Sequence, residues 1–473
     1  MRRINNNLWF FLVVVTTFSN CSRKIYIDRS QFFKDGEAAP GVDLSYYKSV
    51  QLRPHQDSTL AVAMAISGGG SRAANFGLGI MLGLEELLIT ETQDALDQVD
   101  YFSTVSGGGF GAGAYICALY DHHFFQRQTP FSLSQYADDQ ICGDLCYSYA
   151  GALIRGNLNV KLWFSLVDDG DALEKAIDDQ VLGYKRRREA GNKKLPGILL
   201  GDLFVPKGSD QPVLYPMHIT NSTALNTMTI FPFTPDILNQ YQIYGYTHRL
   251  KTIKDDNLDV FSMPLSVGIK SSGSFPVLIS NTTLRSCYSP ERPYLHLIDG
   301  AMTDNTGYYT ALDILRQDES SRKILIIVDA DASGNLYTFS KKEAARSSLG
   351  VLFRLPASGL YARRSTLQSD IETRCQQYDV TPIYFSFSNL IKNNPAEVPH
   401  KIDIKKEMDR LLELMQLENF ELSPYDQQIL YEVLIHIGTK YTMKEEEQLL
   451  LMLTGRMLVR LEEEKIYSYM SNN

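Results

Sequence analysis

Residues 60–73 read Leu-Ala-Val-Ala-Met-Ala-Ile-Ser-Gly-Gly-Gly-Ser-Arg-Ala, an apolar run that stops at three adjacent glycines. A short apolar run bounded by turn residues is typical of a buried strand. The residues from Phe76 to Leu88 are apolar on nearly every side, which predicts a buried helix. The stretch therefore predicts a strand, a glycine-rich turn and a helix, in the order that α/β folds repeat.

The same order recurs at residues 101–119. Tyr101-Phe-Ser-Thr-Val105 predicts a strand, and Ser106-Gly-Gly-Gly109 leads into a helix of small residues over 107–119. Further strands are predicted at 212–220, 295–298 and 323–328, with helical patterns between several of them. This alternation predicts an α/β fold with three layers, a mostly parallel sheet with helices on both faces.

Residues 402–469 carry a charged helical pattern in which apolar positions recur every three or four residues. We expect a C-terminal helical extension that packs on the sheet. A face used for dimerisation or for membrane contact is the alternative.

The composition narrows the class of protein. The chain has 473 residues, of which 44% are hydrophobic and 21% charged, as in ordinary globular proteins. Its formal net charge of −9 argues against a nucleic-acid partner, because binding to phosphates depends on clustered Lys and Arg. No apolar run reaches the roughly 18 residues typical of a membrane-spanning helix.

Residues 1–21 have the features of an export signal. Arg2 and Arg3 precede a short apolar stretch over 8–15, and Cys21 follows in Phe18-Ser-Asn-Cys21. This arrangement resembles a bacterial lipoprotein signal, which implies a lipidated Cys21 and a place in the cell envelope. An uncleaved anchor or a plain secretory peptide is the alternative. The other five cysteines form neither a disulfide framework nor a metal-binding pattern, so we expect them to pack in the interior: Cys117, Cys142, Cys146, Cys287 and Cys375.

The first candidate site segment is Ser67-Gly-Gly-Gly-Ser-Arg-Ala73. Glycines leave backbone N–H groups uncovered, and at a helix N-terminus these groups can bind a phosphate or the oxyanion of an acyl intermediate. The loop lacks the Gly-Lys-Ser/Thr of a P-loop and the Gly-x-Gly-x-x-Gly of a dinucleotide site. A simple tight turn is the alternative.

The second segment runs from Tyr101 to Gly109, where a strand meets another glycine-rich helix start. A Ser on such a turn presents its hydroxyl above the edge of the sheet, and the usual pattern is Gly-x-Ser-x-Gly. Gly108 matches this pattern, whereas Thr104 stands at the first glycine position. Ser106 is therefore the candidate nucleophile, and Ser103, inside the strand, is the poorer one.

The third segment is Leu295-His-Leu-Ile-Asp-Gly-Ala-Met-Thr-Asp-Asn305. Its Asp-Gly follows an apolar run, so Asp299 should lie at the C-terminal end of a strand, where α/β proteins build their sites. A hydroxyl needs a base to become a nucleophile, and Asp299 can serve directly if it reaches Ser106. A plain Asp-Gly turn is the alternative, and Asp304, Asp329 and Asp331 are competing carboxylates.

Together the three segments resemble the patatin-like phospholipase family and the related enzymes of the cytosolic phospholipase A2 type. The glycine loop matches over Gly68-Gly-Gly-Ser-Arg72, the Ser-Gly elbow at Ser106-Gly107, and the Asp-Gly segment at Asp299-Gly-Ala301. Two further matches are Asn305 and the Ser-rich stretch Ser271–Pro276, and the departures are Thr104 and Ala73.

The resemblance covers about residues 60–335 and implies a hydrolase of phospholipids or other acyl esters, without metal or cofactor. By this resemblance Ser106 attacks the acyl carbon, Asp299 acts as its base, and the N–H groups of Gly68, Gly69 and Gly70 hold the oxyanion. The supporting residues would be Arg72, Gly108, Gly300 and Asn305. The expected division is a signal segment at 1–21, a tether to a membrane surface at 22–58, a catalytic domain at 59–345 and the helical extension at 346–473.

Two other functions remain open at this point. A Ser-His-Asp esterase would need a His after Asp299, and only His400 and His436 follow it. A non-enzymatic protein that binds lipid or assists envelope assembly could keep the glycines for structural reasons alone.

Overall fold

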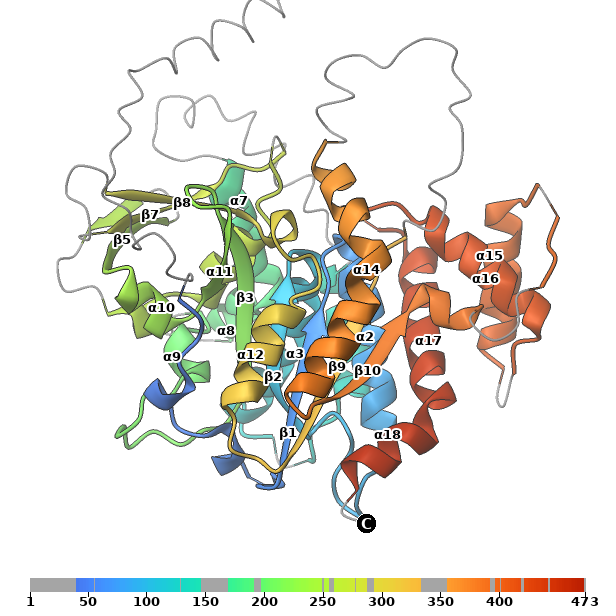
Figure 1. The fold of residues 1–473 in the computed structure, drawn as a ribbon, viewed down its shortest axis with the longest axis horizontal. Helices are drawn as coiled ribbons and strands as arrows, with labels where there is room; N and C mark the ends of the chain where they lie inside the picture. Colours follow the sequence, from blue (N-terminus) through green and yellow to red (C-terminus); the bar gives the residue numbers. More distant parts are fainter. Residues whose placement is uncertain are drawn as a thin grey trace, which may run out of the picture. The chain divides into compact units, whose positions relative to one another are not determined.

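A ten-stranded mixed sheet forms the centre of the molecule, in the order β10-β9-β1-β2-β3-β8-β7-β5-β6, with β4 paired to β3 (Figure 1). The strands are β1 Leu60–Ile66, β2 Val99–Val105, β3 Met217–Ala224, β4 Thr229–Phe233, β5 Ile243–His248, β6 Lys251–Lys254, β7 Thr282–Ser286, β8 Tyr294–Asp299, β9 Arg322–Asp329 and β10 Thr381–Ser386. Strands β10, β9, β1, β2 and β3 are parallel, and the pairs beyond β3 are antiparallel.

The structure is a computed structural model, and it describes residues 40–54, 56–127, 129–145, 169–190, 197–248, 251–254, 259–276, 278–286, 293–332, 355–391, 396–399, 401–417, 421–440 and 443–471. Cys21 and the predicted signal segment lie outside these ranges. The described helices are α2 Ser71–Glu86, α3 Gly107–Phe124, α4 Leu133–Tyr136, α5 Cys142–Leu145, α7 Asp169–Ala176, α8 Tyr184–Glu189, α9 Leu200–Leu203, α10 Pro235–Gln240, α11 Leu265–Ser272, α12 Tyr308–Gln317, α14 Leu355–Gln377, α15 Ile404–Met415, α16 Pro424–His436, α17 Glu445–Leu461 and α18 Glu463–Met470. None of them is long and apolar enough to cross a membrane.

Helices cover both faces of the parallel strands, which confirms the predicted α/β class and its three layers. In Figure 1, α12 and α14 lie in front of the sheet and α2 and α3 behind it. The chain moves from β1 to β2 and β3 in one direction, and β9 and β10 lie on the other side of β1. Because crossovers between parallel strands are right-handed, this reversal puts the two sets of helices on opposite faces. The turn after β1 therefore lies where the strand order reverses, the usual place for a site in such sheets.

The predicted elements are largely confirmed, with two shifts at their ends. Helix α2 begins at Ser71, directly after the three glycines, rather than at Phe76. Strand β3 begins at Met217 rather than at residue 212, because Pro212 and Pro216 have no N–H to donate to a neighbouring strand. Cys117 and Cys375 are buried, as predicted.

Residues 40–54 belong to the folded body, so the predicted tether at 22–58 is wrong for this part. The Arg53 guanidinium pairs with the buried Asp100 carboxylate at 2.9 Å. The side chain of Tyr47 is buried, and its hydroxyl is hydrogen-bonded to Asp236. Both contacts tie this N-terminal segment to the sheet and to α10.

The C-terminal region also belongs to the same body, and it is not purely helical. Strand β10 lies beyond the expected boundary at 345 and pairs with β9 in the central sheet. Helix α17 crosses α2 at very short range: a Cβ atom on Gly79 would lie 2.4 Å from the Met452 carbonyl oxygen, and one on Gly455 would lie 2.6 Å from Gly79. Glycines at the crossing thus let the extension pack on α2, beside the glycine loop.

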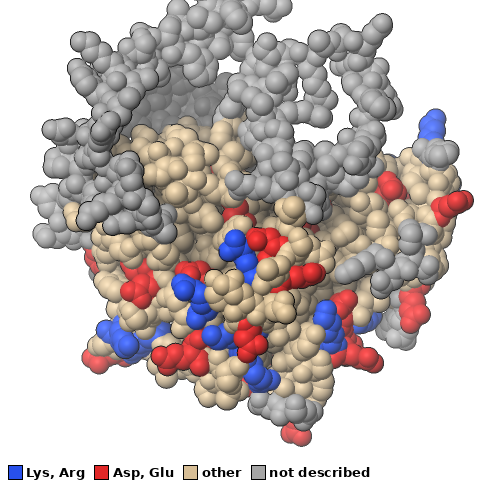
Figure 2. Space-filling view, in the orientation of Figure 1, with Lys and Arg blue, Asp and Glu red and all other residues tan. Residues whose placement is uncertain are grey.

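On the face drawn in Figure 2, Lys and Arg side chains are interspersed with Asp and Glu. The described residues visible there form no large area of a single charge.

Candidate active site

Strand register brings Ser106 and Asp299 to the same place. Ser106 directly follows Val105, which pairs with Asn221 of β3. On the other side of β3, Asp299 pairs with Ser222, the next residue. Asp299 ends its strand as predicted, but β8 runs antiparallel to β3, so it reaches Ser106 from the opposite direction to the parallel strands.

Ser106 sits on a tight turn with a φ of 49° and a ψ of −119°. A non-glycine residue with positive φ is strained unless its surroundings hold it there, and such residues cluster at functional sites. The Ser106 N–H donates to the Ser272 hydroxyl at 2.9 Å, and that hydroxyl donates to the Asn221 carbonyl at 2.5 Å. Ser272 belongs to the Ser-rich stretch 271–276, so this stretch fixes the backbone of the turn.

The glycines after Ser106 are required by the contact between the two turns. A Cβ atom on Gly107 would lie 2.0 Å from the Gly70 carbonyl oxygen, and one on Gly108 would lie 2.5 Å from that of Ile66. The backbone of the elbow therefore packs directly on the backbone of the glycine loop. Thr104 is accommodated because its hydroxyl bonds to His218 Nε2 at 2.9 Å.

Asp299 is a buried carboxylate that lies beside the Ser106 side chain. Its Oδ1 accepts the Ala301 N–H at 2.9 Å, and the Ser106 side chain lies close enough to lower the pKa of the same carboxylate. Burial raises the pKa of Asp299 to about 6, although the Ala301 N–H and the Ser106 side chain oppose the rise. Gly300 is needed because a Cβ atom there would lie 2.1 Å from the Asn221 carbonyl oxygen. At neutral pH this arrangement holds an ionised carboxylate against a serine hydroxyl.

The three glycines of the loop differ in what their N–H groups do. The Gly68 N–H donates to the Asn305 carbonyl at 2.8 Å, so it is already occupied. Gly69 and Gly70 have φ values of 144° and 60°, which L-residues rarely adopt. Within the described part of the chain, neither of their N–H groups has a hydrogen-bond partner. Two backbone donors are thus free beside the Ser106 turn.

Arg72 ties the glycine loop to the rest of the molecule. The buried guanidinium donates to the Ala330 carbonyl and to the Ile437 carbonyl, both at 2.7 Å. Next to it, the Ser71 N–H donates to the Lys440 carbonyl at 2.9 Å. The segment after α16 therefore supports the loop, a role for the C-terminal region that the sequence resemblance did not reach. The sequence signal that could have indicated this contact is the pair of glycines, Gly79 and Gly455, at which α2 and α17 cross.

The competing carboxylates have other partners. Asp304 accepts the N–H groups of Thr306 at 2.9 Å and Tyr309 at 3.2 Å, so it stabilises the start of α12. Asp329 accepts the Tyr384 hydroxyl at 2.6 Å and the N–H of Asp331 at 3.0 Å.

No described histidine is hydrogen-bonded to Ser106 or Asp299. His436 is exposed at the end of α16, where its Nδ1 bonds to the Glu432 carbonyl of its own helix. His400 lies outside the described residues.

A family model described as patatin-like phospholipase matches residues 64–312, which is more than half of the 473 residues. The chain belongs to the patatin-like phospholipase family. Membership supports lipid acyl hydrolysis as the class of activity, and the matched segment contains the glycine loop, Ser106 and Asp299.

Solved structures similar to this patatin-like chain include human GIVD cytosolic phospholipase A2, at 13% identity and a TM-score of 0.39, covering 87% of this chain and 60% of that one. The same enzyme in complex with a methyl gamma-linolenyl fluorophosphonate inhibitor and terbium chloride has 15% identity and a TM-score of 0.38, over 87% and 59%. VipD from Legionella pneumophila has 13% identity and a TM-score of 0.24, over 83% and 67%. The patatin-like chain thus spans about 60% of the length of the human enzyme. No curated protein matches it at a significant level.

Proposed function

We propose that this patatin-like protein hydrolyses carboxylic esters of lipids, with Ser106 as nucleophile and Asp299 as its base. The observation that carries the proposal is that the Ser106 side chain lies beside the buried Asp299 carboxylate, at a strained strand-to-helix turn. A structural serine needs neither the strain nor the carboxylate. Because the pKa of Asp299 is about 6, the group is ionised at pH 7 and still basic enough to accept a proton.

The reaction follows from these positions in two halves. Asp299 takes the Ser106 proton as Oγ attacks the acyl carbon, and the protonated carboxyl then gives that proton to the departing alcohol oxygen. An acyl-Ser106 ester remains. In the second half Asp299 takes a proton from water, the hydroxide oxygen attacks the ester, and Ser106 recovers its proton as the fatty acid leaves.

The oxyanion of each tetrahedral intermediate would be held by the N–H groups of Gly69 and Gly70. Gly68, included on sequence grounds, is left out because its N–H is bonded to the Asn305 carbonyl. Removal of one such donor lowers turnover by about 10²–10³-fold in acyl-transfer enzymes. Supporting roles are assigned to the residues that keep the glycine loop, the Ser106 turn and the Asp-Gly turn in contact: Arg72, Gly108, Gly300 and Asn305.

The proposal is tested by hydrolysis of phosphatidylcholine in mixed micelles, measured as fatty acid released. Wild type should release it, and Ser106→Ala should reduce the rate to background. Ser103→Ala is the matched control, because the Ser103 hydroxyl donates to the Gly307 carbonyl at 2.7 Å and accepts the Asn221 side-chain N–H at 2.9 Å. Full activity in Ser106→Ala would refute the nucleophile. No hydrolysis of phospholipid or of short acyl esters by folded wild type would favour a lipid-binding role.

We further propose that the protein is an exported lipoprotein anchored to a membrane of the cell envelope through Cys21. The support is the signal-like pattern of residues 1–21. In a bacterial host fed labelled palmitate, the wild type should take up label and Cys21→Ala should not. Label in Cys21→Ala would contradict the anchor and leave the proposed chemistry untouched.

A further inference from the structure

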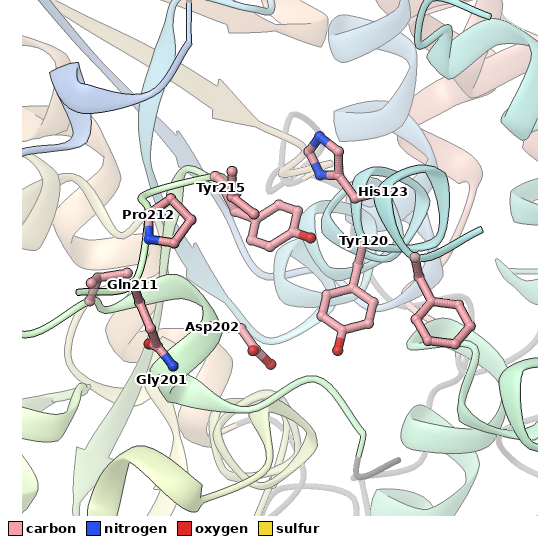
Figure 3. A pocket seen from close by; sticks show the side chains of 10 residues that line it. Tyr120, His123, Gly201, Asp202, Gln211, Pro212 and Tyr215 are labelled. Carbon is pink, nitrogen blue, oxygen red and sulfur yellow. The ribbon is translucent and has the colours of Figure 1, made fainter. Parts of the chain in front are cut away.

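A pocket of about 340 Å³ lies at the far end of helix α3 from the proposed active site (Figure 3). Tyr120, one of its lining residues, is 14 residues beyond Ser106 on the same helix, which puts them about 21 Å apart along the helix axis. The opposite wall comes from α9 and the segment 211–215. The pocket is therefore separate from the proposed acyl-ester site.

Aromatic rings dominate one side of this pocket. The Tyr120 and Tyr215 rings stack with centroids 5.8 Å apart, and Phe124 lies 6.5 Å from Tyr120 at an interplanar angle of 8°. The His123 ring is 5.4 Å from that of Tyr215. Figure 3 shows Tyr120 and His123 on one side of the open space, Gln211 and Pro212 on the other, and the Tyr215 ring between them.

Asp202 supplies the one formal charge among the lining residues. Its Oδ2 accepts the Leu199 N–H at 2.8 Å, which caps the start of α9. Its Oδ1 has no hydrogen bond to any described residue. Burial lowers the pKa of His123, so the imidazole adds no positive charge at neutral pH.

Two cations lie near the pocket without lining it. The Arg187 guanidinium is 5.0 Å from the Tyr120 ring centroid, but it is buried and paired with Asp121 at 2.6 Å. The Lys48 ammonium donates to the Gln211 carbonyl at 2.8 Å on the exposed side. The lining itself thus combines electron-rich rings with one carboxylate, which the Arg187 guanidinium attracts from outside the lining.

We propose that this pocket binds a small organic cation, an ammonium or quaternary ammonium group of the choline type. Cations are attracted to the faces of Tyr and Phe rings, and the Asp202 carboxylate adds a counter-charge, whereas both would repel an anion. The volume is at the small end of ligand sites, which suits a group of this size. Free choline and the headgroup of a choline lipid share this chemistry. The site is independent of the proposed hydrolase activity.

Binding is tested by titration calorimetry of folded full-length protein with choline and with its neutral isostere 3,3-dimethylbutan-1-ol. Choline should bind at least about tenfold more tightly than the isostere, because shape is matched and only the charge differs. Asp202→Asn should weaken choline binding by about tenfold or more, and Asp210→Asn, which removes an exposed charge outside the lining, should not. Since Asp202 also caps α9, Tyr215→Leu provides a second variant that should weaken choline binding without removing that cap.

The source of the cation is tested with vesicles and the Ser106→Ala variant, which prevents turnover. If the Ser106→Ala protein binds phosphatidylcholine vesicles better than phosphatidylglycerol vesicles, and Ser106→Ala/Asp202→Asn does not, the proposal is supported and the cation is a lipid headgroup. Choline binding without that preference would support a free cation. The proposal is overturned if choline binds no better than the isostere, if its Kd exceeds about 10 mM, or if neither pocket variant changes it.

Discussion

Replacing Asp299 by Asn should remove nearly all activity and at the same time stabilise the fold. The Asn side chain has the size of Asp and its Oδ1 can still accept the Ala301 N–H, but it cannot take the Ser106 proton. Loss of a general base costs about 10²–10⁴-fold in rate. In wild type, a base with a pKa of about 6 is about one-eleventh ionised at pH 5, so activity there should be about tenfold lower than at pH 8.

The stability effect follows from the direction of the pKa shift. The pKa of Asp299 is about 6 in the folded protein against 3.8 ordinarily, so the unfolded chain loses this proton first. Ionisation therefore favours unfolding, and the penalty grows as pH rises from about 4 to 6 and is complete above that range. At 1.36 kcal/mol per unit of pKa the penalty is at most about 3 kcal/mol.

Urea unfolding of wild type and Asp299→Asn at pH 8 and pH 4 measures this difference. We expect the variant to be more stable at pH 8, by up to about 3 kcal/mol, with the gap closing at pH 4. The activity of the same samples is measured as the rate at which p-nitrophenol is released from a p-nitrophenyl ester. Retained acylation in Asp299→Asn, or lower stability than wild type at pH 8, would refute the assignment of Asp299 as a buried ionised base.

Three further changes test how the site is held together. Gly108→Ala would put a Cβ atom 2.5 Å from a carbonyl oxygen of β1, so the thermal midpoint and the acylation rate should both fall. Gly143→Ala, whose Cβ atom would have nothing within 4 Å, should change neither, and equal effects of the two substitutions would contradict the close packing. Arg72→Gln removes two guanidinium hydrogen bonds to backbone carbonyls and should lower kcat by about tenfold or more with little change in KM. An unchanged kcat in steady-state assays would contradict the role of Arg72 in positioning the glycine loop. Arg53→Met leaves buried Asp100 without its cation and should cost about 3–5 kcal/mol in urea unfolding at pH 8; a neutral effect would mean that residues 40–54 add little to the fold.

Much of the site could be predicted from local sequence, because its parts are strand-turn-helix units with glycines at fixed offsets. Ser106 directly follows one predicted strand and Asp299 ends another, and this is visible without a structure. Their meeting across Asn221 and Ser222 was not predictable in the same way. The direction of β8 is set by pairing with β3, a contact between residues far apart in the chain.

Other features depended on tertiary contacts that local patterns do not carry. The glycine run suggested three equivalent donors, but the fold of the Asn305 loop uses the Gly68 N–H. Residues 40–54 look polar and irregular, yet buried contacts at Tyr47 and Arg53 hold them to the body. Ile437 and Lys440 support the glycine loop through their backbone carbonyls. Because any residue type has such a carbonyl, the side chains at these positions do not predict the contact.

The most direct test of the central claim is intact-mass labelling of the folded protein with a fluorophosphonate, followed by peptide mapping. This reagent forms a stable adduct only with an activated nucleophile. We predict one adduct per chain on Ser106, none in Ser106→Ala, and labelling slowed by about 10²-fold or more in Asp299→Asn. An adduct on another residue, an unchanged rate in Asp299→Asn, or no adduct on folded wild type would contradict the Ser106–Asp299 account.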